Sequence, residues 1–286
     1  MQPMLNIAVR AARRAGDIII RSLNRVHQLD VRSKGRNDFV TEVDTVVEQD
    51  IIATIRKSYP DHGFLAEESG AQQDGRGEDQ YTWIIDPLDG TTNFLHGFPQ
   101  FAVSIALQHR GKLLQAVVYD PMRQELFTAS RGDGAQLDGR RIRVSKQIEL
   151  EGALIGTGFP YRANLNYLDA YMPMLRLMME KTAGIRRPGS AALDLAYLAA
   201  GRIDGFFEFG LGPWDTAAGT LLITEAGGMV GTLSGHEYKQ EGHIVAGTPK
   251  VYAAIVEAIR PFVPEELKGF RTEAPASADL PPTIQR

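Results

Sequence analysis

The 286-residue sequence contains no cysteine. Disulfide bonds, thiolate metal sites and thiol nucleophiles are therefore excluded. The sequence also lacks an apolar run long enough to span a bilayer. Its first twenty residues carry charged side chains within their apolar pattern, which is not typical of a secretory signal. The formal net charge is only −4, so the surface as a whole is not expected to attract nucleic acid. These features predict a cytoplasmic protein without a membrane partner.

The segment from Trp83 to Phe94 reads W-I-I-D-P-L-D-G-T-T-N-F and holds the densest chemistry in the sequence. The β-prone run Tyr81–Ile85 ends in Asp86. Because Pro87 cannot donate to a sheet ladder, the strand is expected to stop there. Gly90 permits a tight turn, and Thr91 and Thr92 after it can cap a short helix.

This segment places two carboxylates, Asp86 and Asp89, three positions apart at a strand end. Two anions held that close repel each other, and both stay ionised only if a cation lies between them. The available ligands are oxygens, which favour a hard ion such as Mg²⁺. The adjacent helix start suits a phosphate. The pattern therefore indicates metal-assisted phosphoryl chemistry, although the short D-P-x-D-G string alone is better explained by a strand, a turn and an Asp-capped helix.

The segment resembles the signature of the inositol monophosphatase family of Mg²⁺-dependent, Li⁺-sensitive phosphatases. Three further strings carry the resemblance: D-F-V-T-E-V-D ending at Asp44, F-L-A-E-E-S ending at Ser69, and P-W-D-T-A-A-G beginning at Pro213. Lys34 corresponds to the family's loop lysine, but its spacing to Asp44 is one residue shorter than in the family pattern. The resemblance covers roughly residues 3–261.

The resemblance implies a layered α-β-α-β-α sugar-phosphatase fold with the active site between two halves. Residues 1–150 would form an N-terminal α+β half with metal-binding motifs, and residues 151–263 a C-terminal α/β half with substrate and metal contacts. The Pro-, Ala- and Glu-rich segment 264–286 predicts a disordered tail. Periodicity separately predicts a helix over 3–23, antiparallel strands between residues 101 and 129, and a Met-rich helix over 165–181. The polar segment 72–80 predicts an exposed loop that could cover the site.

The resemblance also implies the roles of individual residues. The metal ligands would be Glu67, Asp86, the carbonyl of Leu88, Asp89 and Asp215, holding two or three Mg²⁺ ions. The catalytic group would comprise Glu67 and Thr91, which orient the attacking water, and Asp44, which reaches the metal site through water. Substrate contacts would come from Glu67, Asp89, Gly90, Thr91, Gly189, Ser190, Ala191, Glu208 and Asp215.

The implied function is hydrolysis of myo-inositol 1-phosphate or a related polyol or sugar phosphate. Without cysteine, and with Asp86 and Asp89 acting as ligands, direct attack by water is favoured over a covalent intermediate. Alternatives within the same fold are fructose-bisphosphatase and nucleotide 3′-phosphatase activities.

A second hypothesis is of a different class. The sequence most resembles bacterial members of the family, some of which are implicated in transcription antitermination and ribosomal RNA maturation. Residues 1–37 contain eight Lys or Arg and two Asp, a balance of +6. Arg10, Arg13 and Arg14 could therefore form a docking face for RNA or the transcription complex, although an ordinary solvated helix face explains the same pattern. The family resemblance further suggests a homodimer.

Overall fold

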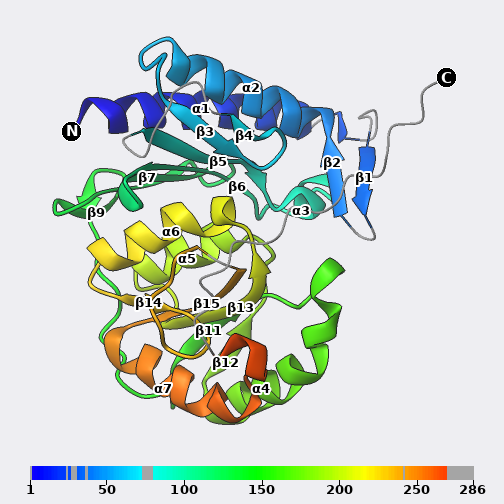
Figure 1. The fold of residues 1–286 in the computed structure, drawn as a ribbon, viewed down its shortest axis with the longest axis vertical. Helices are drawn as coiled ribbons and strands as arrows, with labels where there is room; N and C mark the ends of the chain where they lie inside the picture. The colour runs from blue at the N-terminus through cyan, green and yellow to red at the C-terminus, as the bar shows by residue number, and fades with distance from the viewer. Residues whose placement is uncertain are drawn as a thin grey trace.

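A computed structural model describes residues 2–23, 25–26, 31–35, 38–72, 80–240 and 242–268. The chain forms five layers, in the order helix, sheet, helix, sheet, helix (Figure 1). Helices α1 and α2 cover the outer face of an eight-stranded sheet, and α5 and α6 lie between this sheet and a five-stranded sheet. Helices α4 and α7 cover the far side of the second sheet. This is the predicted α-β-α-β-α arrangement.

The outer helices form because apolar residues recur at helical spacing. Helix α1 spans Pro3–Leu23, as predicted, and buries Ala8, Ala12 and Ile19. Helix α2 spans Glu42–Arg56 and begins at a capping box in which Thr41 and the third helical residue exchange hydrogen bonds. Both helices pack on the same core cluster as the strand residues Trp83 and Ile85.

The first sheet lies mainly between residues 63 and 141 and has the strand order β10-β9-β8-β7-β6-β5-β3-β4. Its strands are β3 (Gly63–Ala66), β4 (Gly70–Gln72), β5 (Tyr81–Asp89), β6 (Ala102–His109), β7 (Lys112–Asp120), β8 (Glu125–Ser130), β9 (Gly134–Leu137) and β10 (Arg140–Arg141). Neighbours from β5 to β10 pair antiparallel, which confirms the predicted meander. Only the β3–β5 pair within this sheet is parallel.

Strand β5 corrects one prediction. It continues through Pro87 to Asp89 instead of ending at Asp86. The ladder with β6 is interrupted between Asp86, which lies opposite Ser104, and Asp89, which lies opposite Ala102. Because the missing N–H of proline falls in this irregularity, the strand keeps its direction without losing a ladder hydrogen bond.

The second sheet is mixed and has the strand order β12-β11-β13-β15-β14. Its strands are β11 (Leu154–Thr157), β12 (Gly184–Arg186), β13 (Gly205–Leu211), β14 (Met229–Gly231) and β15 (Gly242–Gly247). The associated helices are α4 (Leu168–Lys181), α5 (Ala191–Ala199), α6 (Pro213–Glu225) and α7 (Pro249–Ile259). The short helix α3 (Thr91–Leu95) follows β5. Single turns of 3₁₀-helix occupy Arg260–Phe262 and Glu265–Leu267, and a longer one, Arg162–Tyr167, precedes α4.

Three expectations fall at the edges of the described chain. Lys34 was expected in a loop but lies on β1 (Val31–Gly35), which pairs with β2 (Asp38–Thr41); its side chain is outside the described part. Residues 73–79 of the expected covering loop, and residues 269–286 of the expected tail, are also outside it. Residues 264–268, expected to belong to the tail, instead continue the fold, because the carbonyl of Leu267 accepts a hydrogen bond from Ser234.

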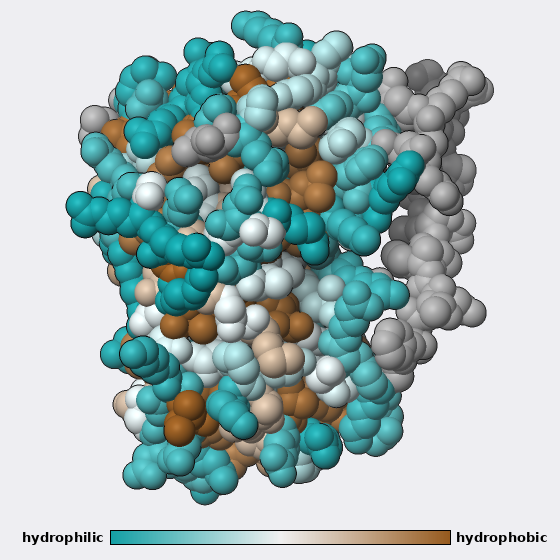
Figure 2. Space-filling view, turned by 90° about the vertical axis from the view of Figure 1, so that its left-hand side faces the viewer, coloured by the Kyte–Doolittle hydropathy of each residue, from teal (hydrophilic) through white to brown (hydrophobic). Residues whose placement is uncertain are grey.

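No described helix is both long enough and apolar enough to cross a bilayer. On the face shown in Figure 2, hydrophilic side chains predominate and the hydrophobic residues form small separate groups.

Candidate active site

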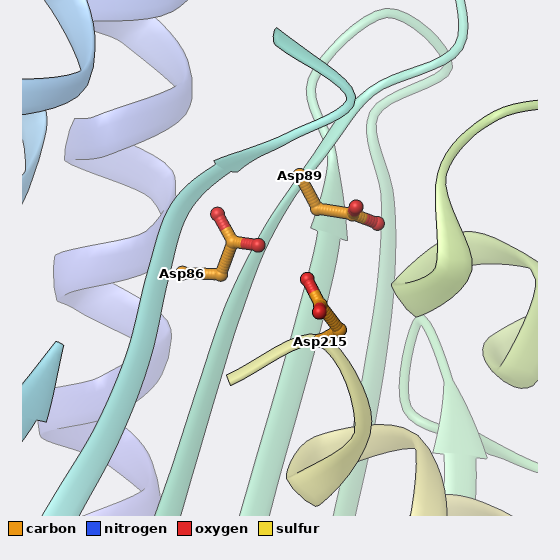
Figure 3. A group of neighbouring side chains, drawn as sticks. All are labelled: Asp86, Asp89 and Asp215. Carbon is orange, nitrogen blue, oxygen red and sulfur yellow. The ribbon is translucent and has the colours of Figure 1, made fainter. Parts of the chain in front are cut away.

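Three aspartates from both halves of the chain meet beneath the end of β5. Asp86 and Asp89 come from β5, and Asp215 comes from the first turn of α6. One carboxylate oxygen from each lies within 4.8 Å of the others. Figure 3 shows the three side chains directed toward a common space. Because the oxygens belong to segments far apart in sequence, the cluster depends on the packing of the two sheets through α5 and α6.

A backbone amide donates a hydrogen bond to one carboxylate oxygen of Asp86 and to one of Asp215. The amide of Leu88 donates to Oδ1 of Asp86 at 2.9 Å. The amide of Gly212 donates to Oδ2 of Asp215 at 2.6 Å, across the start of α6. These bonds restrict the rotamers of both aspartates, so their carboxylates are oriented before any ligand arrives.

Asp89 also joins the two halves. Its Oδ2 accepts from the hydroxyl of Ser190 at 2.5 Å and from the amide of Ala192 at 2.7 Å. Both donors lie at the start of α5. A carboxylate there interacts favourably with the positive end of the helix dipole. Asp89 therefore both contacts the start of α5 and contributes an oxygen to the aspartate cluster.

The electrostatics of the cluster favour a bound cation. Burial, followed by the carboxylates of Glu67, Asp89 and Asp215, raises the pKa of Asp86 well above its ordinary value. Burial and the carboxylate of Asp215 raise the pKa of Asp89 to about 7, although its hydrogen bonds oppose the rise. Three carboxylates in so small a buried volume can all ionise only if positive charge is supplied. An all-oxygen donor set of this kind fits a hard divalent ion such as Mg²⁺.

Two further predicted ligands lie at the same cavity. Glu67 follows β3, and Leu88 lies between the two aspartates of β5; both line the cavity with Asp86. Glu67 is not one of the three residues whose oxygens meet within 4.8 Å. Its carboxylate is nevertheless the strongest charged influence on the pKa of Asp86, so the two acids are close enough to interact.

Asp44 is not among the residues that line the cavity, but it contacts the site through the hydroxyl of Thr91. It is fully buried in the first turn of α2. Its Oδ2 accepts from the amide and hydroxyl of Thr41 at 2.8 and 2.6 Å, and its Oδ1 accepts from the hydroxyl of Thr91 at 2.9 Å. Burial raises the pKa of Asp44, and these hydrogen bonds oppose the rise. The prediction that Thr91 caps α3 is wrong, because the N-cap residue is Gly90.

The cavity has a volume of about 630 Å³. Every residue predicted to contact substrate lies on its lining: Glu67, Asp89, Gly90, Thr91, Gly189, Ser190, Ala191, Glu208 and Asp215. Burial raises the pKa of Glu208 to about 8, and Arg187 opposes this rise. The cavity lining thus carries a carboxyl group that interacts with the Arg187 guanidinium, and both groups can hydrogen-bond to hydroxyl groups.

Among the polar residues that line the cavity and were not predicted from sequence, three have contacts or charges that bear on the site: Asp194, Arg187 and Asn93. Asp194 lines it from the first turn of α5, and burial and the charges of Glu208 and Asp89 raise its pKa well above the ordinary value. Arg187 lies 5.3 and 5.2 Å from the ring centroids of two aromatic residues that also line the cavity, Phe159 and Tyr161. An Asp in a helix's first turn and an Arg after a short strand give no local signal of a site, so neither could have been recognised.

Asn93 is the third missed residue. It lies on α3, and its amide nitrogen is within hydrogen-bond distance of the carbonyls of Gln100, Pro188 and Gly189, at 2.7, 2.9 and 3.2 Å. An amide group has two hydrogens, so two of these contacts can be satisfied at once. Asn93 therefore ties the segment after β5 to the loop before α5.

Comparison with known proteins agrees with this geometry. Residues 1–263 match the model of the inositol monophosphatase family. A Pseudomonas aeruginosa protein named Nus factor SuhB is 57% identical over 271 residues, covering 94% of this chain and all of the relative. The crystal structure of extragenic suppressor protein suhB from Bartonella henselae has a TM-score of 0.86 at 43% identity, covering 91% of this chain and 99% of that one. An inositol monophosphatase from Anabaena has a TM-score of 0.80 at 38% identity, with 92% and 97% coverage. The chain therefore belongs to the inositol monophosphatase family.

Proposed function

We propose that the protein is a Mg²⁺-dependent phosphomonoesterase that hydrolyses myo-inositol 1-phosphate or a related polyol or sugar phosphate. The observation that carries this proposal is the convergence of Asp86, Asp89 and Asp215 within 4.8 Å at a cavity of about 630 Å³. Membership of the family supports the reaction class.

In this proposal the three aspartates, Glu67 and the carbonyl of Leu88 would hold two or three Mg²⁺ ions. Bound Mg²⁺ would supply positive charge to the phosphoryl oxygens and would increase the acidity of water. The chain's own groups fix the positions of these ligands, because an amide or hydroxyl donates to one oxygen of each aspartate.

Thr91 and Asp44 would orient the attacking water. The hydroxyl of Thr91 lies 2.9 Å from Oδ1 of Asp44 and 3.1 Å from the carbonyl of Leu88. A hydroxyl has one proton to donate, and donation to Asp44 leaves its lone pairs to accept a hydrogen bond from water in the cavity. Asp44, buried and bonded at both oxygens, holds that hydroxyl in place. Glu67, which also lines the cavity, would accept a proton from the attacking water.

The substrate would be held between the halves. The amides of Gly90 and Thr91 would hold phosphate oxygens. Ser190 and Glu208 line the part of the cavity on the second half, where they would bind the hydroxyl groups of a polyol, together with Gly189 and the start of α5. Fructose bisphosphate and nucleotide 3′-phosphates remain the competing substrates.

A panel of phosphate esters tests the proposal. Release of phosphate should require Mg²⁺ and should be fastest with an inositol or polyol monophosphate. Asp86→Asn should remove nearly all activity while the circular dichroism spectrum stays that of the wild type, because Asp86 would be a ligand of the ions. Asp17→Asn, an exposed change on α1, is the control and should keep full activity. Full turnover by Asp86→Asn, or a phospho-enzyme trapped during turnover, would contradict the mechanism.

We infer a second role, association with the transcription machinery, from the Pseudomonas aeruginosa relative named Nus factor SuhB. All three arginines of the basic face on α1 are exposed. Arg14 forms an ion pair with Asp50 at 2.5 Å and keeps 57% of its side chain exposed, so its charge is partly neutralised. A strain lacking the gene distinguishes the roles: rescue by Asp86→Asn supports a role independent of catalysis, and failure of rescue assigns the phenotype to the phosphatase.

A homodimer belongs to the same set of proposals. Helix α4 buries Met174 and Met178 but leaves Leu168, Met172 and Met179 between 40 and 65% exposed. An apolar stripe of this kind is suited to self-association. Met172→Asp should shift the protein from dimer to monomer in light scattering after gel filtration, and an unchanged dimer would place the interface elsewhere.

A further inference from the structure

Glu48 is a buried acid that the mechanism above does not use. It lies on α2, and only 2% of its surface is exposed. A buried carboxylate is stable only if hydrogen bonds or opposite charge replace its hydration. Two backbone amides fill this role: the amide of Glu68 donates to Oε2 at 2.8 Å, and the amide of Ser69 donates to Oε1 at 3.0 Å.

Both amides belong to the turn that follows Glu67. The amide of Glu67 itself donates to the carbonyl of Ile85 on β5 at 3.1 Å. Three consecutive amides are therefore fixed, one by the sheet and two by Glu48. The backbone on both sides of the Glu67 side chain cannot rotate without breaking one of these bonds. The same side chain lines the cavity and acts on the pKa of Asp86.

Helix α2 holds a second part of the site in the same way. Asp44 and Glu48 are four residues apart, so they lie one above the other on one face of the helix. Asp44 accepts from Thr91, the first residue of α3, which follows β5. Glu48 accepts from the turn after β3. One helix face thus fixes the relative position of two segments that come from different strands.

We propose that Glu48 is a positioning residue that orients Glu67 toward the metal-binding aspartates. This inference rests on the proposed phosphatase function. A carboxylate is suited to the task because each oxygen can accept from one of two neighbouring amides. In a glutamine, the NH₂ group would face one of those N–H donors, which would lose its acceptor. An aspartate would be one methylene shorter. Either change loosens the turn while leaving the metal ligands themselves intact.

The test compares Glu48→Gln with Glu42→Gln, an exposed change on the same helix. For Glu48→Gln the Mg²⁺ concentration that gives half-maximal activity should rise about tenfold or more, the usual effect of removing a group that orients a metal ligand. The KM for the phosphate ester at saturating Mg²⁺ should stay close to that of the wild type. Without substrate, calorimetric Mg²⁺ binding should weaken by the same factor, and the amides of Glu68 and Ser69 should exchange hydrogen faster.

Glu48→Asp and a double mutant complete the design. Glu48→Asp keeps the charge and should give an intermediate Mg²⁺ affinity; it carries the test by the same measurements if Glu48→Gln does not fold. In a Glu67→Gln background, Glu48→Gln should weaken Mg²⁺ binding no further, because its effect passes through Glu67.

The outcomes separate this inference from the proposed function. A wild-type protein whose phosphatase activity is absent or independent of Mg²⁺ refutes the proposed function and the inference built on it. If the wild type is Mg²⁺-dependent but Glu48→Gln and Glu48→Asp bind Mg²⁺ as the wild type does, the proposed function stands and Glu48 serves stability alone. Additive losses in the double mutant also overturn the inference.

Discussion

Acidification should destabilise the protein through His243, a partly buried residue on β15. Its Nδ1 accepts a hydrogen bond at 3.1 Å from the amide of Gly210. Gly210 forms the irregularity between β13 and β15 and lines the cavity next to Glu208. The rings of Tyr167 and Phe209 lie 5.0 and 5.4 Å from the imidazole. A protonated imidazole cannot accept the Gly210 hydrogen bond and would be poorly solvated there.

The magnitude follows from the pKa of His243, which burial lowers from 6.5 to about 4, with Glu266 opposing the shift. The unfolded chain takes up the proton as the pH falls through 6.5, whereas the native protein does so only near 4. The stability due to this group is therefore complete above pH 6.5 and is lost progressively below it. Linkage gives a loss of about 2 kcal/mol between pH 7.5 and 5, and at most about 3 kcal/mol in total.

Urea unfolding measured from pH 7.5 to pH 4 checks this prediction against two variants. His243→Asn places an uncharged acceptor near the position of Nδ1, so its unfolding free energy should fall by about 2 kcal/mol less than that of the wild type down to pH 5. The control is His236→Asn, at an exposed position, which should follow the wild type. Titration of the His243 imidazole by NMR near pH 6.5, or parallel acid profiles for His243→Asn and the wild type, would refute the reasoning.

Three further predictions concern the cavity. Asp89→Asn keeps an acceptor for α5 but removes one of three repelling charges. In chelator, the variant should therefore have a melting temperature no lower than that of the wild type, and millimolar Mg²⁺ should raise this temperature less than it does for the wild type. A lower melting temperature in chelator would contradict this prediction. Asn93→Ala removes the hydrogen bonds to the carbonyls of Gln100, Pro188 and Gly189. The KM for the phosphate ester should therefore rise, and the free energy of unfolding should fall by about 1–2 kcal/mol. An unchanged KM would show that the loop before α5 stays in place. Gly90 has a φ of 99°, and Gly90→Ala adds a Cβ 2.8 Å from a carbonyl oxygen, so the free energy of unfolding measured in urea should fall by more than about 1 kcal/mol. The control is Gly97→Ala, at a φ of 65° in open space, which should reduce the unfolding free energy less. Equal losses in the two variants would exclude the clash.

Local spacing determined much of this protein from its sequence. The helical periodicity of residues 3–23 and the alternation of the strands were sufficient to predict α1 and the meander. The strand end with Asp86 and Asp89 was recognisable because both acids lie on one short segment with a proline and a glycine. Such features depend on backbone geometry within a few residues, which the sequence specifies directly.

The irregular pairing of β5 with β6 at Pro87 shows the limit of local propensity. Pro87 was expected to end the strand, but the partner strand β6 accommodates it by an irregular ladder. The propensity of one residue was outweighed by pairing along the rest of β5, which is set by the burial of Trp83 and Ile85 beneath α1 and α2.

Residue spacing alone did not determine which distant side chains meet; the family resemblance implied that Asp215 joins Asp86 and Asp89, and the tertiary structure gives the physical reason. Asp215 joins Asp86 and Asp89 because α6 lies between the two sheets, and Glu48 reaches the turn after Glu67 because α2 crosses the first sheet. In sequence, Glu48 is an ordinary helix residue. Contacts of this kind depend on how whole layers pack, and a single segment holds no information about the distance to a partner that folds in from elsewhere.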